Sequence, residues 1–165
     1  MKQHLLPRSS RALLLSTFIV AGIGFPCSVV GDDSAPKRPP FVHAKAIQFG
    51  GHWYLWVKDP VPFEEALVRA RKMKGQLLMI ESEEENEFAR AHTEIPTWLG
   101  AKRAKNRQWQ GQDGQVVFGY SHWAPGQPQG GAGENYVAIH PDGQWHDYLA
   151  AKLGFCIEWR GAPEK

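Results

Sequence analysis

Histidines and an acidic residue gather near the C-terminal end of the chain, where their side chains could hold a metal ion. His140, His146 and Asp147 lie close together in the sequence, and imidazole and carboxylate groups are common ligands of transition metals. Their spacing does not match the HExxH pattern of zinc hydrolases. A histidine that hydrogen-bonds in a turn or at the surface is more common, so we favour that interpretation over a metal-assisted hydrolase.

Four basic residues form a second candidate site. Lys102, Arg103, Lys105 and Arg107 could bind an acidic glycan or a phosphate-rich polymer, but such a run more often forms a solvated turn, which we favour. The chain has 19 Lys and Arg against 17 Asp and Glu, a formal charge of +2. This balance lacks the basic excess that is typical of proteins that bind nucleic acid.

The sequence lacks the motifs of nucleophilic catalysis and nucleotide binding. It contains no GxSxG elbow, no phosphate-binding loop and no dinucleotide fingerprint. Cys156 lies between Phe155 and Ile157 in an apolar run, which predicts a buried thiol rather than a nucleophile. The acidic run 81–87 is typical of a helix start, because acidic side chains stabilise the first turn. An enzyme is therefore the least supported class.

The N-terminal segment 1–31 is typical of a signal peptide. Basic residues precede an apolar run at 12–25, and small residues follow it. The run is shorter than the roughly 20 residues that span a membrane, so we predict export and removal near Gly31. The mature protein would then be secreted or held in the periplasm or at the cell surface, with lipid modification at Cys27 as an alternative.

One domain is predicted after this segment. Residues 32–40 contain three prolines and no apolar periodicity, which indicates an extended linker. The domain would occupy 41–161 and end in a short tail, 162–165. The chain has 165 residues, of which 42% are hydrophobic, enough for one domain with its own core.

Two helices are predicted in the first half of the domain. Apolar residues recur at helical spacing over 62–74, with acidic residues at the start, basic residues at the end and Gly75 as a stop. Ser82 and Glu85 match a capping box, which predicts a second helix. In that helix we expect the core to contain Phe88, Ala89 and Ala91.

Short apolar segments predict the strands. Gly50 and Gly51 lie between aromatic and branched residues, which favours a hairpin. Further strands are predicted at 77–80, 98–100, 136–139 and 153–159. The segment 102–134 is rich in glycine and longer than most loops, and the aromatic residues within it, Phe118, Tyr120 and Trp123, favour an ordered loop.

Taken in order, these segments resemble the C-type lectin-like domain family. The motifs that carry the resemblance are FEEA at 63–66, GQL at 75–77, IESEEE at 80–85, WLGA at 98–101, DG at 113–114, Trp123, GQP at 126–128, ENY at 134–136 and GQWHD at 143–147. No single motif is specific, but the ordered set covers nearly the whole predicted domain. The resemblance implies an α+β fold with two helices, small antiparallel sheets and a long ordered loop.

Members of this family typically contain two disulfides that this chain lacks. The resemblance places one bridge at Ala70 and Ile157 and the other at Tyr136 and Ala150. Replacing both partners of a bridge leaves no orphan thiol, and the space can be repacked. The resemblance therefore implies a disulfide-free variant that depends on its apolar core.

The resemblance also implies a ligand site on the long loop. Sugar-binding members hold a calcium ion that the sugar hydroxyls help to coordinate, and the residues that match this site are Gln127, Gln129, Glu134, His146 and Asp147. The calcium ligands among them would be Gln127, Glu134 and Asp147. Calcium prefers six to eight oxygen ligands, and its affinity rises with the number of carboxylates. With two carboxylates and an imidazole, the set favours a weakened or absent calcium site.

The predicted function is non-enzymatic binding of a carbohydrate through this loop face, with calcium as the possible cofactor. The alternative is a protein-interaction module that keeps the lectin scaffold without the metal, and its partner would be an envelope or extracellular protein. Trp123 and Trp145 could stack on a sugar ring. Because large aromatic side chains are mostly buried, we favour core positions for both.

Overall fold

The computed structural model describes residues 37–115 and 119–161. The predicted signal peptide 1–31, with Cys27, the first part of the linker, Phe118 and the tail 162–165 lie outside the described residues, so the predictions on them stay predictions. Within the described part, neither helix has the length and apolar character needed to cross a membrane.

The strands of the described domain form one mixed sheet. They are β1 (Ile47–Phe49), β2 (His52–Val61), β3 (Gln76–Leu77), β4 (Thr97–Arg103), β5 (Trp109–Gln110), β6 (Tyr136–Ile139), β7 (Trp145–Tyr148) and β8 (Leu153–Trp159). Their order is β1-β2-β8-β4-β6-β7, with β3 beside β8 and β5 beside β4. β4 and β8 are parallel, and the other pairs are antiparallel. The α+β fold with two helices is confirmed, but a single mixed sheet replaces the small antiparallel sheets that were expected.

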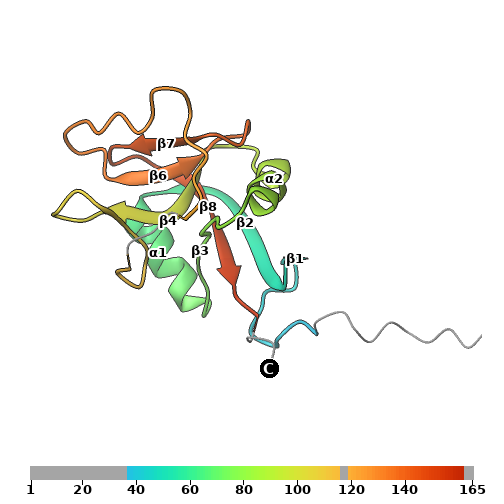
Figure 1. Cartoon of the computed structure of the whole chain (residues 1–165). Coiled ribbons are helices and arrows are strands. Elements are labelled where there is room, and N and C mark those ends of the chain that lie inside the picture. Colours follow the sequence, from blue (N-terminus) through green and yellow to red (C-terminus); the bar gives the residue numbers. More distant parts are fainter. Residues whose placement is uncertain (1–36, 116–118, 162–165) are drawn as a thin grey trace, which may run out of the picture. The chain divides into compact units, whose positions relative to one another are not determined.

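The two helices cover different faces of the central strands (Figure 1). Successive residues of a strand point to opposite faces, and β8 divides its side chains in this way. Phe155, Ile157 and Trp159 belong to the core that contains α1 (Phe63–Lys72), whereas Cys156 belongs to the core that contains Ala89 of α2 (Glu83–His92). Because β8 is buried on both faces, its sequence is a nearly continuous apolar run. The buried thiol predicted at Cys156 is confirmed.

The hairpin predicted at Gly50 and Gly51 joins β1 to β2. Both glycines have positive φ, 55° and 82°, as a two-residue turn of type I′ requires.

Helix α1 ends in a Schellman motif that uses Lys74 instead of a glycine as its left-handed residue. Lys74 has φ 59°, and the Gly75 amide donates to the Ala70 carbonyl at 3.0 Å. Gly75 is needed for a different reason. A Cβ on it would lie 2.5 Å from Ile157 Cγ2 and 3.0 Å from the Glu158 carbonyl oxygen.

Helix α2 begins at the predicted cap, but its buried face differs from the prediction. Ser82 Oγ accepts from the Glu85 amide at 3.2 Å, while the Glu85 carboxylate accepts from the Glu81 amide at 2.8 Å. Ala91 is exposed, and Asn86 is buried in its place. Asn86 belongs in the core because Trp145 Nε1 donates to its Oδ1 at 2.8 Å and its Nδ2 donates to the Gly143 carbonyl at 3.2 Å. The prediction of Ala91 as a core residue is therefore wrong.

The four positions that the family resemblance assigned to disulfides have different surroundings. Ala70 and Ile157 are fully buried in the α1-side core. The ring of Tyr136 lies 4.7 Å from that of Phe63 and packs against the same core, whereas Ala150 is exposed. Apolar packing thus fills both positions of one pair and one position of the other.

The close approach at Gly75 gives a test of the fold. We expect Gly75→Ala to lower the free energy of unfolding by about 1–3 kcal/mol, because the new methyl group overlaps Ile157 and the Glu158 backbone. Urea denaturation would measure the change. Gly119→Ala is the matched control, since nothing lies within 4 Å of a Cβ at that position. Equal stabilities of the two variants would contradict the packing described here.

Candidate functional site

The predicted loop 102–134 contains the end of β4 and all of β5, so the long loop of the structure is the segment between β5 and β6. The carboxylate of Asp147, on β7, ties this loop to the sheet. Its Oδ1 accepts from the Gln129 amide at 3.0 Å, and its Oδ2 accepts from the Gly130 amide at 2.9 Å. The Asp147 amide in turn donates to Gln127 Oε1 at 3.4 Å. The Asp147 side chain is 0% exposed, so these bonds are shielded from water and the loop is held at a defined position.

A guanidinium from β4 neutralises the charge of Asp147. Arg103 Nη2 donates to Asp147 Oδ2 at 3.0 Å, and the Arg103 side chain is only 9% exposed. The guanidinium carbon lies 4.4 Å from the centroid of the Trp109 ring, which favours the cation through its π face. A buried ion pair with these further contacts is stable because its charges are both paired and hydrogen-bonded.

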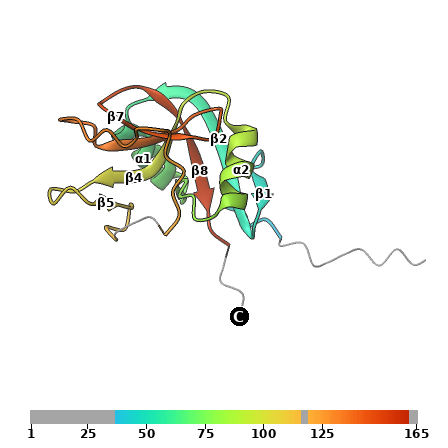
Figure 2. The ribbon, with the colours of Figure 1, turned by 45° about the horizontal axis from the view of Figure 1, so that its top comes forward.

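A second arginine holds the same loop. Arg107 Nη2 donates to the Gly130 carbonyl at 2.8 Å, and in both ribbon views the β4–β5 hairpin and the segment before β6 extend to the same side (Figures 1 and 2). The predicted basic cluster therefore divides. Lys105 is exposed, as expected of a solvated turn, whereas Lys102 lies on β4 and donates to Glu64 at 3.3 Å. Arg103 and Arg107 bind the long loop, a contact that spacing in the sequence could not reveal.

Two other predicted site residues lie along this loop. Gln129 is exposed, and its backbone rather than its side chain contacts Asp147. Glu134 is half-buried, and its Oε2 accepts from the Gly131 amide at 2.7 Å. The structure thus joins Gln127, Gln129 and Asp147 through direct bonds, and Glu134 closes the adjoining turn of the same loop.

His146 does not join this group. It alternates with Asp147 on β7 and therefore faces the other side of the sheet, where its ring stacks on that of His140 at 4.1 Å. His140 Nε2 lies 2.7 Å from the Tyr148 hydroxyl, and burial followed by the neighbouring His146 lowers the pKa of His140. Since the two rings stack and Asp147 pairs with Arg103, these three residues do not converge on one metal ion.

The residues predicted to hold calcium do not fit that ion in this arrangement. Asp147 Oδ2 already accepts two hydrogen bonds, and Arg103 supplies the positive charge that a cation would bring. Among the predicted ligands, Glu134 is then the one carboxylate without a cationic partner, and Gln127 adds a neutral amide. Calcium needs six to eight oxygen ligands, so this donor set is too small.

The two tryptophans singled out in the sequence pack against each other, Trp123 from the long loop and Trp145 from β7. Trp145 is 0% exposed, and Trp123 is half-buried with its ring 5.8 Å from that of Trp145. The core position favoured for Trp145 is therefore confirmed, and Trp123 packs against the same core.

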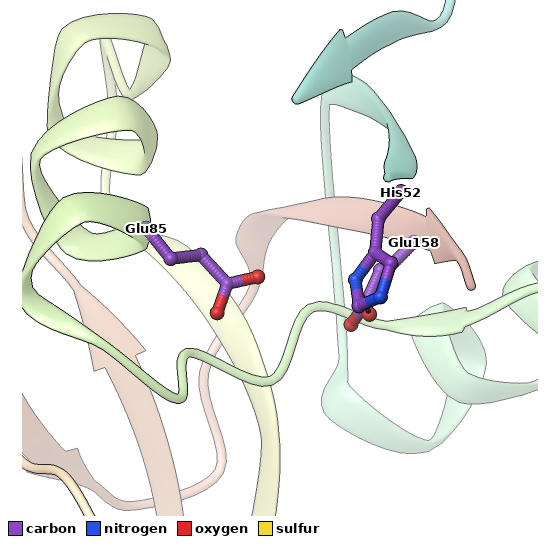
Figure 3. A group of neighbouring side chains, drawn as sticks. All are labelled: His52, Glu85 and Glu158. Atoms are coloured by element: carbon purple, nitrogen blue, oxygen red, sulfur yellow. Dashed lines mark ion pairs between the residues drawn. The ribbon is translucent and has the colours of Figure 1, made fainter. Parts of the chain in front are cut away.

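A second cluster of charged groups, which the sequence analysis missed, lies between β2, β8 and α2. One ligand-capable atom from each of His52, Glu85 and Glu158 lies within 4.8 Å of the others. Figure 3 shows the His52 ring beside the Glu158 carboxylate, with Glu85 extending from α2 toward them. Glu158 is fully buried. A glutamate within an otherwise apolar strand is the one signal in the sequence that pointed to this cluster.

This cluster is a network of hydrogen bonds rather than an open metal site. The Glu158 carboxylate accepts hydrogen bonds from four donors at 3.0–3.1 Å, which are His52 Nδ1, Arg160 Nε, Gln76 Nε2 and the Met79 amide. Tyr54 donates its hydroxyl to Glu85 at 2.7 Å. Burial and this bond raise the pKa of Tyr54, so the hydroxyl remains a donor. The network satisfies a buried charge that would otherwise be costly.

The His52–Glu158 pair makes stability depend on pH. The hydrogen bond to Glu158 raises the pKa of His52 above 6.5, so the folded protein binds this proton more tightly than the unfolded chain does. The stabilisation is complete below about pH 6.5 and is lost as pH rises through the folded-state pKa. We expect His52→Gln to remove roughly 1 kcal/mol of stability at acidic pH and less at alkaline pH.

Urea denaturation from about pH 5.5 to 8.5 would measure this difference. His43→Gln, which replaces an exposed histidine, should leave the pH profile of the natural protein unchanged. A stability difference between the natural protein and His52→Gln that stays constant with pH would contradict the ion pair.

Comparison with known proteins places this chain in a family. The model of the Lectin C-type domain matches residues 59–157. The human low affinity immunoglobulin epsilon Fc receptor is 33% identical over 117 residues, which cover 67% of this chain and 35% of the receptor. The mouse asialoglycoprotein receptor 2 is 32% identical over 115 residues, which cover 65% of this chain and 38% of that receptor. The chain thus spans about a third of the length of these relatives.

The fold is shared with solved domains as well. The C-type carbohydrate-recognition domain of cow CD23, solved in the presence of a GlcNAc2Man3 oligosaccharide, has a TM-score of 0.66 and is 24% identical, covering 73% of this chain and 97% of that one. The family model covers more than half of this chain. The chain therefore belongs to the C-type lectin domain family, whose domains are non-catalytic binding modules.

Proposed function

We propose that this domain binds a glycan through the face that the long loop forms with β7. The observation that carries the proposal is a loop that is held in place while polar side chains remain accessible on it. Asp147 fixes the Gln129 and Gly130 amides, and the Gln129 side chain is exposed. A fixed loop lowers the entropy lost on binding, which raises affinity for a ligand that makes few contacts.

The groups on this face suit sugar hydroxyls. The side-chain amides of Gln127 and Gln129 can each donate and accept hydrogen bonds. Glu134 uses Oε2 within the loop, which leaves Oε1 for a hydroxyl donor. Under this proposal the binding residues are Gln127, Gln129 and Glu134, with Asp147 as the residue that positions them. His146 faces the other side of the sheet and takes no part.

The relatives support a ligand outside the cytoplasm. Asialoglycoprotein receptor 2 is named for a glycoprotein, and the cow CD23 domain was solved with an oligosaccharide present. Together with the signal peptide predicted at 1–31, this favours an exported protein whose glycan is displayed at a cell surface or in an extracellular matrix.

A second candidate function is protein recognition on the same scaffold. The pairing of Asp147 with Arg103 favours it, because one of the two carboxylates available for a sugar-binding metal is already neutralised. Leu149 is 54% exposed, and its Cδ2 would lie 3.0 Å from a Cβ on Gly133 of the loop, so an accessible apolar side chain lies beside the loop, as suits a protein surface. One of the relatives is named as a receptor for an immunoglobulin.

A glycan array separates the two candidates. We expect binding to at least one glycan class, and we expect Gln129→Ala to weaken it about tenfold or more, because a polar group that orients a ligand is lost. The melting temperature should not change, since the Gln129 side chain is exposed.

Gln48→Ala is the matched control, because Gln48 is also exposed but lies on β1, outside the loop. It should bind like the natural protein. If no glycan binds, while an extracellular protein is retained by the natural protein and released by Gln129→Ala, then the glycan proposal fails and protein recognition takes its place.

A further inference from the structure

The long loop of a sugar-binding domain of this family is expected to contain a bound cation, yet here the position beside Asp147 contains a cation from the protein itself. Arg103 Nη2 lies 3.0 Å from Asp147 Oδ2. The same carboxylate accepts two further hydrogen bonds, from the loop amides of Gln129 and Gly130. One side chain therefore receives a positive charge from β4 and two hydrogen bonds from the loop.

We propose that Arg103 is a built-in substitute for the metal ion: its guanidinium neutralises Asp147 and so keeps the loop from Gln127 to Gly131 in its binding conformation without calcium. Arg103 acts as a positioning residue, since its guanidinium lies beneath the loop and the proposed ligand contacts lie on it. The inference rests on the proposed function and adds to it how the loop of that binding face is held in its conformation.

The surroundings of Arg103 support a fixed charge at this place. Its backbone is paired in β4 with Trp109 of β5, and its guanidinium stacks on the Trp109 ring at 4.4 Å. The Arg103 amide donates to the Asn135 carbonyl at 2.8 Å, at the far end of the loop. Strand pairing, ring stacking and the ion pair thus restrict the guanidinium to one position, whereas a free ion would exchange with solvent.

The chemistry of the guanidinium also fits the role. Arginine is effectively always protonated in proteins, and its planar fork binds carboxylates well. A buried aspartate without a cationic partner would strongly destabilise the folded state. The Nε of Arg103 is buried without a hydrogen-bond partner among the described residues, a cost that the ion pair and the ring contact must offset.

Amide hydrogen exchange, followed by NMR on the full chain, tests the proposal directly. The reporters are the Gln129 and Gly130 amides, which donate to Asp147. We expect their exchange rates to be the same in EDTA and in calcium at about 10 mM, a concentration above the Kd of weak extracellular sites. In Arg103→Met both rates should rise about tenfold or more, because a charged hydrogen-bond partner of Asp147 is lost.

Two further variants separate charge from shape. Arg103→Lys keeps the positive charge, so we expect the two amides to retain most of their protection. Lys105→Met is the matched control, because Lys105 is an exposed basic residue between β4 and β5, and the hydrogen bonds of Asp147 come from Arg103 and the loop instead. It should leave the two reporter amides within about twofold of the natural protein.

Three results would overturn the proposal. They are faster exchange of the natural protein in EDTA, unchanged exchange in Arg103→Met, and a loss of protection in Arg103→Lys equal to that in Arg103→Met. The EDTA comparison uses the natural protein, so it can overturn the proposal even if a variant does not fold. None of these measurements involves a glycan, so a failure of glycan binding on the array is distinguishable from a failure of this inference.

Discussion

Strand β8 is the element on which the rest of the domain depends, because it is buried on both faces and pairs along both edges. β2 pairs with one edge, and the other edge is shared by β4 near the start of β8 and by β3 near its end. The antiparallel pairing with β2 brings an early strand beside the last one, and the two helices pack on opposite faces of β8. A chain of this size without a disulfide among its described residues obtains its stability from this shared core.

Nearly all of the buried polar groups inside this core form hydrogen bonds, and their partners come from distant parts of the chain. The indole N–H groups of Trp98, Trp145 and Trp159 donate to Val61, Asn86 and Met73, respectively. Glu158 receives its four hydrogen bonds from β2, β3, the segment after β3 and Arg160. Each bond is available only after the strands and helices have assembled, so these contacts favour one arrangement of the core over others.

The face proposed to bind ligand depends on pairings between distant residues in the same way. β4 and β7 are fixed by their partners in the sheet, and they present Arg103 and Asp147 to each other. The long loop has little regular structure of its own, so its shape comes from backbone amides that bind Asp147 and from a carbonyl that binds Arg107. The rigid part of the fold thus determines the conformation of the part proposed to bind ligand.

The sequence by itself determined the elements whose signals are local. Helical spacing, the cap at Ser82, the turn at Gly50 and Gly51, and the apolar run of β8 each depend on neighbouring residues, and the order of motifs was enough to indicate the family. Only the tertiary structure decided the pairings between distant residues: Arg103 with Asp147, Asn86 with Trp145, and His52 with Glu158. The physical reason is that a charge or an amide shows its role only when its partner is known, and these partners lie 44, 59 and 106 positions apart in the chain.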